Sequence, residues 1–85
     1  MEQDRRPLTA EEAHILSLVR ATYGGRNTEE KVIFPGKGAV IWAENESGDP
    51  VIVVNLTNIA MFAAHDRLSD QQVIEQWLTI PNRAG

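Results

Sequence analysis

Apolar side chains recur at helical spacing near both ends of the chain and alternate with other residues in the middle. Over residues 8–23 they return every three or four positions, which predicts an amphipathic helix. Thr9 and Glu12 form a capping box at its start. Gly24 and Gly25 end it, because glycine adopts the left-handed conformation that a helix C-cap requires.

The middle of the chain predicts three strands. Residues 39–45 and 51–56 are separated by the turn formers of residues 46–50, which indicates an antiparallel hairpin. Residues 31–34 are β-branched but stop at Pro35, so we expect a short edge strand there. Alternation assigns two faces to the hairpin. One face carries Ala39, Ile41, Ala43, Ile52, Val54 and Leu56, and the other carries Val40, Trp42, Val51 and Val53.

Helical spacing returns at Thr57. A short helix over residues 59–65 is expected, capped by Thr57 or Asn58 and burying Ile59, Phe62 and Ala63. Ser69 and Gln72 form a second capping box that begins the last helix. The apolar stripe of that helix is Val73, Ile74, Trp77 and Leu78, and Pro81 ends it.

These elements predict an α+β domain of order α-β-β-β-α-α. Its three-stranded antiparallel sheet is a hairpin plus a short edge strand, packed with one N-terminal and two C-terminal helices. We expect one domain over residues 8–80, a flexible arm over residues 1–7 and a frayed tail over residues 81–85. A chain of 85 residues without cysteine has a small core and no disulfide, so oligomerisation is an obvious further source of stability.

Composition argues against several classes of function. The net charge of −4 disfavours a general nucleic-acid binder, which needs a basic face to contact phosphates. No apolar run reaches the ~20 residues of a membrane span, and the first residues lack a secretory signal, so a soluble cytoplasmic protein is expected. The lack of targeting features also suggests a bacterial or phage source. No cofactor motif is present.

A histidine beside a carboxylate is the strongest candidate for chemistry. His65 and Asp66 follow an apolar helix and could mark a ligand-binding or enzymatic site, with Tyr23 or His14 as further members. Neighbouring residues on a helix rarely pair, and no nucleophile is placed near them, so an enzyme is disfavoured. His14 and His65 supply two imidazoles, fewer ligands than a catalytic zinc site takes, and no metal site is predicted.

Two other patterns have simpler explanations. Residues 34–38 contain the glycines and lysine of a phosphate loop, but they precede a strand, so we interpret them as a turn. Basic residues concentrate in the first half of the chain, where glutamates offset them. Weak nucleic-acid contact through Arg5, Arg6, Arg20 and Arg26 is therefore the least favoured alternative.

The second sheet face is the most informative feature. Val40, Trp42, Val51 and Val53 would expose an apolar surface to water, which an isolated domain avoids. Either the two C-terminal helices divide between the two faces of the sheet, or a partner covers the second face. We favour a non-enzymatic protein-interaction module that forms a homodimer, or binds another protein, through the face around Trp42.

Overall fold

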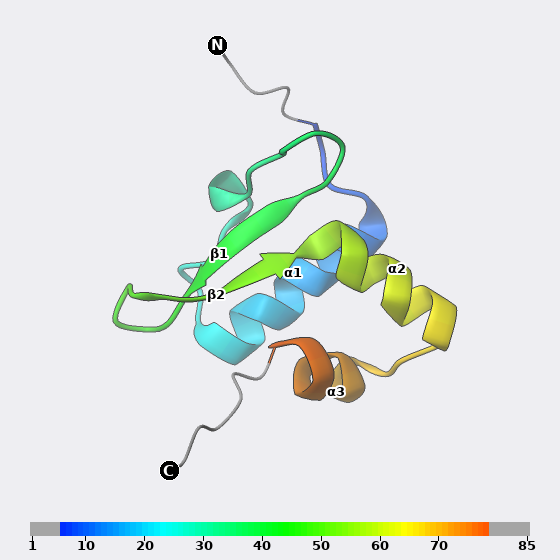
Figure 1. The fold of residues 1–85 in the computed structure, drawn as a ribbon. Helices are drawn as coiled ribbons and strands as arrows, with labels where there is room; N and C mark the ends of the chain where they lie inside the picture. The colour runs from blue at the N-terminus through cyan, green and yellow to red at the C-terminus, as the bar shows by residue number, and fades with distance from the viewer. Residues whose placement is uncertain (1–5, 79–85) are drawn as a thin grey trace.

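The computed structural model describes residues 6–78, and its first helix begins and ends where the sequence predicts (Figure 1). Helix α1 (Ala10–Tyr23) is capped by Thr9, whose hydroxyl accepts a hydrogen bond from the Glu12 amide at 3.1 Å. The Glu12 carboxylate accepts from the Thr9 amide at 3.0 Å, which completes the capping box. Gly24 ends the helix with φ of +122°, a region that side chains disfavour.

The predicted hairpin is confirmed. Strands β1 (Val40–Glu44) and β2 (Pro50–Asn55) pair antiparallel. Trp42 lies opposite Val53, and the register shifts after Ala43 so that Glu44 pairs with Pro50. The alternation is also as expected on the inner face, where Ala39, Ile41, Ala43, Val54 and Leu56 are buried.

The predicted three-stranded sheet is wrong, because the described residues form a two-stranded sheet. In place of an edge strand, Ile33 makes a single antiparallel bridge with Val40, with hydrogen bonds of 2.8 and 2.9 Å. Glu29–Lys31 form a 3₁₀ turn, η1, immediately before it. Val32 and Phe34 are nevertheless buried while Ile33 is exposed, so the segment keeps strand-like alternation without a ladder.

A buried asparagine explains why the ladder stops. If pairing continued from Ile33 and Val40, Glu29 would lie opposite Glu44. The Asn27 carboxamide occupies that place: its oxygen accepts from the Glu44 amide at 2.7 Å, and its nitrogen donates to the Glu44 carbonyl at 2.9 Å. One side chain therefore satisfies the two backbone groups of Glu44 that a third strand would have paired.

Helix α2 (Leu56–Asp66) begins three residues earlier than predicted, directly where β2 ends. Its cap is Asn55, which accepts from the Asn58 amide at 3.0 Å, so neither Thr57 nor Asn58 is the cap. Ile59 is buried as expected, whereas Phe62 is 41% exposed and Ala60 is buried instead.

The second capping box is confirmed at α3 (Asp70–Val73), where Ser69 and Gln72 bond each other reciprocally. The chain continues as a π-helical turn, η2 (Ile74–Leu78). Val73 and Leu78 of the predicted stripe are buried, and Trp77 is 38% exposed. The predicted end of this helix at Pro81 lies outside the described residues.

The helices and the sheet share one core. In Figure 1, α1 crosses behind the hairpin, α2 continues from β2, and α3 lies beside α1. Helix α1 contacts α2, η2 and β1, and the Tyr23 hydroxyl donates to the Leu78 carbonyl.

The small α+β class is as predicted. Residues 1–5 of the expected arm and the expected tail lie outside the described residues, while Arg6 is half-buried against Glu12.

Candidate functional site

The sheet surface that faces away from the helices is apolar and open. Trp42 and Val53 lie directly opposite each other on the two strands and are 58% and 48% exposed. Directly opposed residues share a face, as do residues two apart on one strand. The outer face therefore consists of Ile33, Val40, Trp42, Val51 and Val53.

Local sequence places these side chains outward. Ile41 and Val54, the sequence neighbours of Trp42 and Val53, have 0% and 1% exposure and lie in the core. Because successive side chains of a strand point to opposite faces, Trp42 and Val53 point outward. Ile33 joins the same face through its bridge with Val40 and is 40% exposed. None of the described helices covers Trp42, so the expectation that C-terminal helices divide between the faces is not met by residues 6–78.

One ion pair lies beside the outer face. Lys31 and Glu44 contact each other at 2.9 Å between Nζ and Oε2. Glu44 follows Trp42 by two positions and so points to the same side of β1. The segments that build this surface, residues 31–34, 40–44 and 50–55, contain one lysine and one glutamate, so their formal charges cancel.

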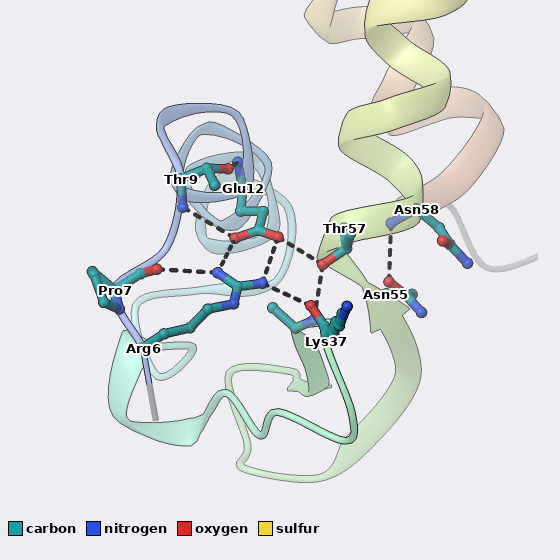
Figure 2. Close-up of polar contacts among 9 residues, drawn as sticks. Arg6, Pro7, Thr9, Glu12, Lys37, Asn55, Thr57 and Asn58 are labelled. Carbon is teal, nitrogen blue, oxygen red and sulfur yellow. Dashed lines mark hydrogen bonds and ion pairs between the residues drawn. The ribbon is translucent and has the colours of Figure 1, made fainter. Parts of the chain in front are cut away.

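A buried polar cluster holds the start of α1 to the start of α2 (Figure 2). Arg6 donates to the two carboxylate oxygens of Glu12 at 2.8 and 2.9 Å. The Thr57 hydroxyl accepts from the Ala39 amide at 2.8 Å and donates to Glu12 at 2.7 Å. Arg6 also donates to the Lys37 carbonyl at 3.1 Å and lies 5.1 Å from the centroid of a buried phenylalanine ring.

This cluster holds segments of the same chain together. The Arg6 hydrogen bonds lower the pKa of Glu12 to about 2; burial opposes this effect, while bonds from Thr57 and Thr9 add to it. Glu12 bonds Arg6, Thr9 and Thr57, and its side chain is 4% exposed. The capping-box pattern identified Glu12 in the sequence. No sequence pattern identified Arg6, whose contact with Lys37 joins residues 31 positions apart.

The predicted histidine site has no enclosing surface. His65 is 82% exposed at its side chain and contacts Asp66 at 2.9 Å between Nδ1 and Oδ1. The two residues do pair, contrary to our expectation for neighbours on a helix, at the point where α2 ends. Neither residue lines the two hollows described below. Tyr23 is bound to the Leu78 carbonyl, and burial raises its pKa.

A hollow of about 400 Å³ lies between α1 and α2. Alanines form much of its wall, and its ionisable lining residues are Glu11, His14 and Asp70. His14 pairs with Asp70 at 2.7 Å, so it contacts α3 instead of Glu11 or His65. A second hollow of about 310 Å³ adjoins it near Thr57 and Met61. In the part of the chain that the structure describes, no three His, Cys, Asp or Glu side chains are grouped to hold a metal ion.

The arginines of the nucleic-acid alternative have contacts within the fold. Arg6 pairs with Glu12, Arg20 donates to the Asn27 carbonyl at 2.8 Å, and Arg26 donates to the Glu46 carbonyl at 3.1 Å. Arg5 lies outside the described residues. The loop over residues 34–38 is a turn in which the Gly38 amide donates to the Pro35 carbonyl at 3.3 Å.

Comparison with known proteins adds no assignment. The chain matches no protein-family model, no curated protein and no solved structure. Among the described residues, no helix is both long and apolar enough to cross a membrane.

Proposed function

We propose that this chain is a non-enzymatic interaction module that associates with a second copy of itself through the outer face. The observation that carries the proposal is the exposure of Trp42 and Val53, 58% and 48%, at directly opposed positions of the hairpin. Adjacent exposed apolar side chains on one sheet face are typical of interaction surfaces. Tryptophan is also one of the residues enriched at the energetic centre of interfaces.

The size of the core supports association. A domain of 85 residues buries a smaller share of its surface than a larger one and has a correspondingly small stability margin. Covering the outer face would remove Trp42, Val53 and Ile33 from water. This would stabilise a complex by roughly 25 cal/mol per Å² of apolar area buried. The helical side of the sheet already holds the core, so this gain is open only to another molecule or to residues outside 6–78.

A second copy suits this surface because the surface is uncharged overall. The whole chain carries a net charge of −4, so two copies repel each other over most approaches. The strands and the bridge segment contribute only Lys31 and Glu44, already paired with each other at 2.9 Å. Two outer faces can therefore meet without like-charge contact, in the sheet-on-sheet packing of about 10 Å separation that apolar faces adopt.

Sedimentation equilibrium of the wild type and of Trp42→Glu tests the proposal. We expect a wild-type dimer and a Trp42→Glu monomer with an unchanged far-ultraviolet circular dichroism spectrum, because a buried unpaired carboxylate opposes contact. Met61→Glu is the matched control, since Met61 is 57% exposed on α2, away from the outer face. The Met61→Glu protein should remain a dimer.

The outcomes separate the possible occupants. A wild type that stays monomeric at about 1 mM would refute self-association, because a Kd weaker than this corresponds to a binding free energy of less than about 4 kcal/mol. If the monomeric wild type binds another protein and the Trp42→Glu variant does not, the outer face binds that protein. The proposal that a second copy covers the face is then wrong. A Trp42→Glu dimer would show that the copies meet elsewhere.

A further inference from the structure

Helix α2 is more apolar than its packing in the described fold requires. Seven of the nine residues from Leu56 to Ala64 are apolar, yet the buried ones, Leu56, Ile59 and Ala60, all lie in the first half of the helix. Met61 is 57% exposed, and Ala64 is exposed. In Figure 1, α2 extends beyond the end of β2, away from the hairpin. A helix with apolar residues on most sides is normally covered on most sides, so the second half of α2 lacks cover that its sequence suits.

This uncovered part of α2 borders a continuous groove. The two hollows of about 400 and 310 Å³ share Glu11, Ala60 and Ala64 in their linings, so they form one groove between α1 and α2. The lining runs along α2 from Thr57 to Ala64 and continues to Leu68. At 1.5 Å per residue the α2 part is roughly 10 Å long, or about two helical turns. Because alanine side chains end at Cβ, another chain can approach this wall closely.

The groove is negatively charged. Its ionisable lining residues are Glu11, Glu12, His14 and Asp70, and no described lysine or arginine lines it. Glu12 is neutralised by Arg6, whereas Glu11 has no ion pair among residues 6–78. Asp70 contacts His14 at 2.7 Å, and histidine is counted as neutral at pH 7. The charge that remains on the groove is therefore that of Glu11 and Asp70, and an occupant of complementary charge is cationic.

A second copy does not supply such an occupant from its described helices. Together α1, α2, α3 and η2 contain one arginine, Arg20, and no lysine. Arg20 already donates to the Asn27 carbonyl at 2.8 Å. Two grooves placed face to face would bring Glu11 and Asp70 of both copies together, and like charges oppose such a contact. The charge of the groove thus favours a different protein over a second copy.

We infer that the groove between α1 and α2 binds a basic amphipathic helix of a partner protein. Helices dock in apolar grooves through side chains at positions i, i+3 or i+4, and i+7, which would lie on the alanines of α2. Lysine or arginine side chains beside that stripe would contact Glu11 and Asp70. The groove is built by helices and the Trp42 face by strands, so this site goes beyond the proposed self-association and does not depend on it.

NMR titration with a defined peptide tests the site. The probe is a synthetic helix of about four turns with leucine at i, i+3, i+4 and i+7 and lysine at its other positions. We expect it to bind the wild-type protein with a Kd below about 100 μM. The amide signals of Glu11, Ala60 and Ala64 should shift, and those of Trp42 and Val53 should not. A control peptide with glutamate in place of lysine should bind at least about tenfold more weakly.

Two pairs of variants separate the groove from general attraction. Glu11→Lys should weaken binding of the lysine peptide at least about fivefold, while Glu30→Lys, the same charge change at an exposed residue outside the groove, should have a smaller effect. Ala64→Gln leaves the charge unchanged and fills the groove, so we expect at least about a tenfold loss. Its control is Ala21→Gln, at an exposed position of α1 that does not line the groove.

The contrary results each overturn the inference. The lysine peptide would fail to bind at about 1 mM, the glutamate peptide would bind as well, or each variant would behave like its control. Shifts confined to Trp42 and Val53 would show that the peptide covers the outer face instead. Groove signals that move with protein concentration in the absence of peptide would show that a second copy occupies the groove. Circular dichroism of each variant confirms that it remains folded.

Discussion

The Arg6 guanidinium and the Glu12 carboxylate meet through two hydrogen bonds of 2.8 and 2.9 Å, with Glu12 buried and Arg6 about one-third exposed. Charge-assisted bidentate pairs of this kind are stronger than hydrogen bonds between neutral groups. Arg6 holds the pKa of Glu12 at about 2, and the pairing raises the pKa of Arg6. The ion pair therefore couples the start of α1 to the acid stability of the whole fold.

Acid should destabilise the protein through Glu12. The folded pKa of about 2 lies below the unfolded value of 4.5, so the unfolded state binds more protons between them. The contribution of Glu12 is complete above pH 4.5 and is lost as the pH falls towards 2. We expect a loss on the order of 2 kcal/mol in the free energy of unfolding over this window, measured by urea denaturation.

Glu12→Gln isolates this effect. The glutamine does not titrate, so the variant should be less stable at neutral pH and lose less stability than the wild type on acidification. Glu11→Gln is the matched control, because Glu11 is exposed one position away on α1. Equal acid losses in the wild type and Glu12→Gln would show that other carboxylates control acid unfolding.

Asn27→Ala should be among the most destabilising single substitutions. It deletes three side-chain hydrogen bonds, two to the backbone of Glu44 and one to the Gly24 carbonyl at 3.1 Å. Backbone groups left without partners cost about 1–3 kcal/mol each when buried, so we expect a total loss of about 2–4 kcal/mol in the free energy of unfolding. The Glu44 amide should also exchange faster in the folded protein.

Asn58→Ala is the comparison for this prediction. Asn58 is exposed, its side chain makes no described hydrogen bond, and its substitution should change stability by less than about 0.5 kcal/mol. Similar losses in the two variants would mean that Asn27 does not replace a strand in the way described.

Short-range signals made most of the fold predictable. Both capping boxes depend on residues three apart, and the hairpin on turn formers between two alternating runs, so each could be recognised within a few positions. The third strand could not be excluded, because Asn27 acts on Glu44 across 17 positions and no local pattern marks a side chain that replaces a strand. The early start of α2 had a different cause: Asn55 is both the last residue of β2 and the cap of α2, so the strand pattern concealed a cap bond to the Asn58 amide only three positions away.

The candidate site was predictable only in part. Alternation identified Trp42 and Val53 as members of one face, and their exposure agrees with that assignment. Ile33 was missed because its place on that face depends on one bridge to Val40. The dimer stays a prediction, since side-chain spacing identifies an apolar surface without identifying what covers it.

Gly24→Ala should destabilise the protein. Gly24 has φ of +122°, and a Cβ at this position would lie 3.4 Å from the Glu46 Cγ. An alanine must either adopt this disfavoured backbone or shift the end of α1, at a cost of about 1–2 kcal/mol in the free energy of unfolding. Gly25→Ala is the control, because no atom lies within 4 Å of a Cβ there. Urea unfolding in which Gly25→Ala loses as much as Gly24→Ala would refute the conformational argument.

The aromatic pair between α2 and η2 should stabilise the C-terminal turn. The Phe62 and Trp77 rings stack with centroids 5.5 Å apart and planes 10° apart, although both are about 40% exposed. Such pairs contribute about 0.5–1.5 kcal/mol beyond their buried area. Phe62→Ala should lower the free energy of unfolding by about 1 kcal/mol and shift the Trp77 fluorescence towards longer wavelength, measured in a Trp42→Phe background so that one tryptophan reports.

Met61→Ala provides the contrast for this pair. Met61 precedes Phe62 on α2 and is 57% exposed, so its loss should cost less than about 0.5 kcal/mol and leave the Trp77 emission unchanged. A double-mutant cycle of Phe62→Ala and Trp77→Ala measures the pair directly, because it subtracts what each ring contributes alone. A coupling energy near zero would mean that the two rings lie together without stabilising the π-helical turn, and that other contacts, such as the burial of Leu78 and its bond from the Tyr23 hydroxyl, hold it against the core.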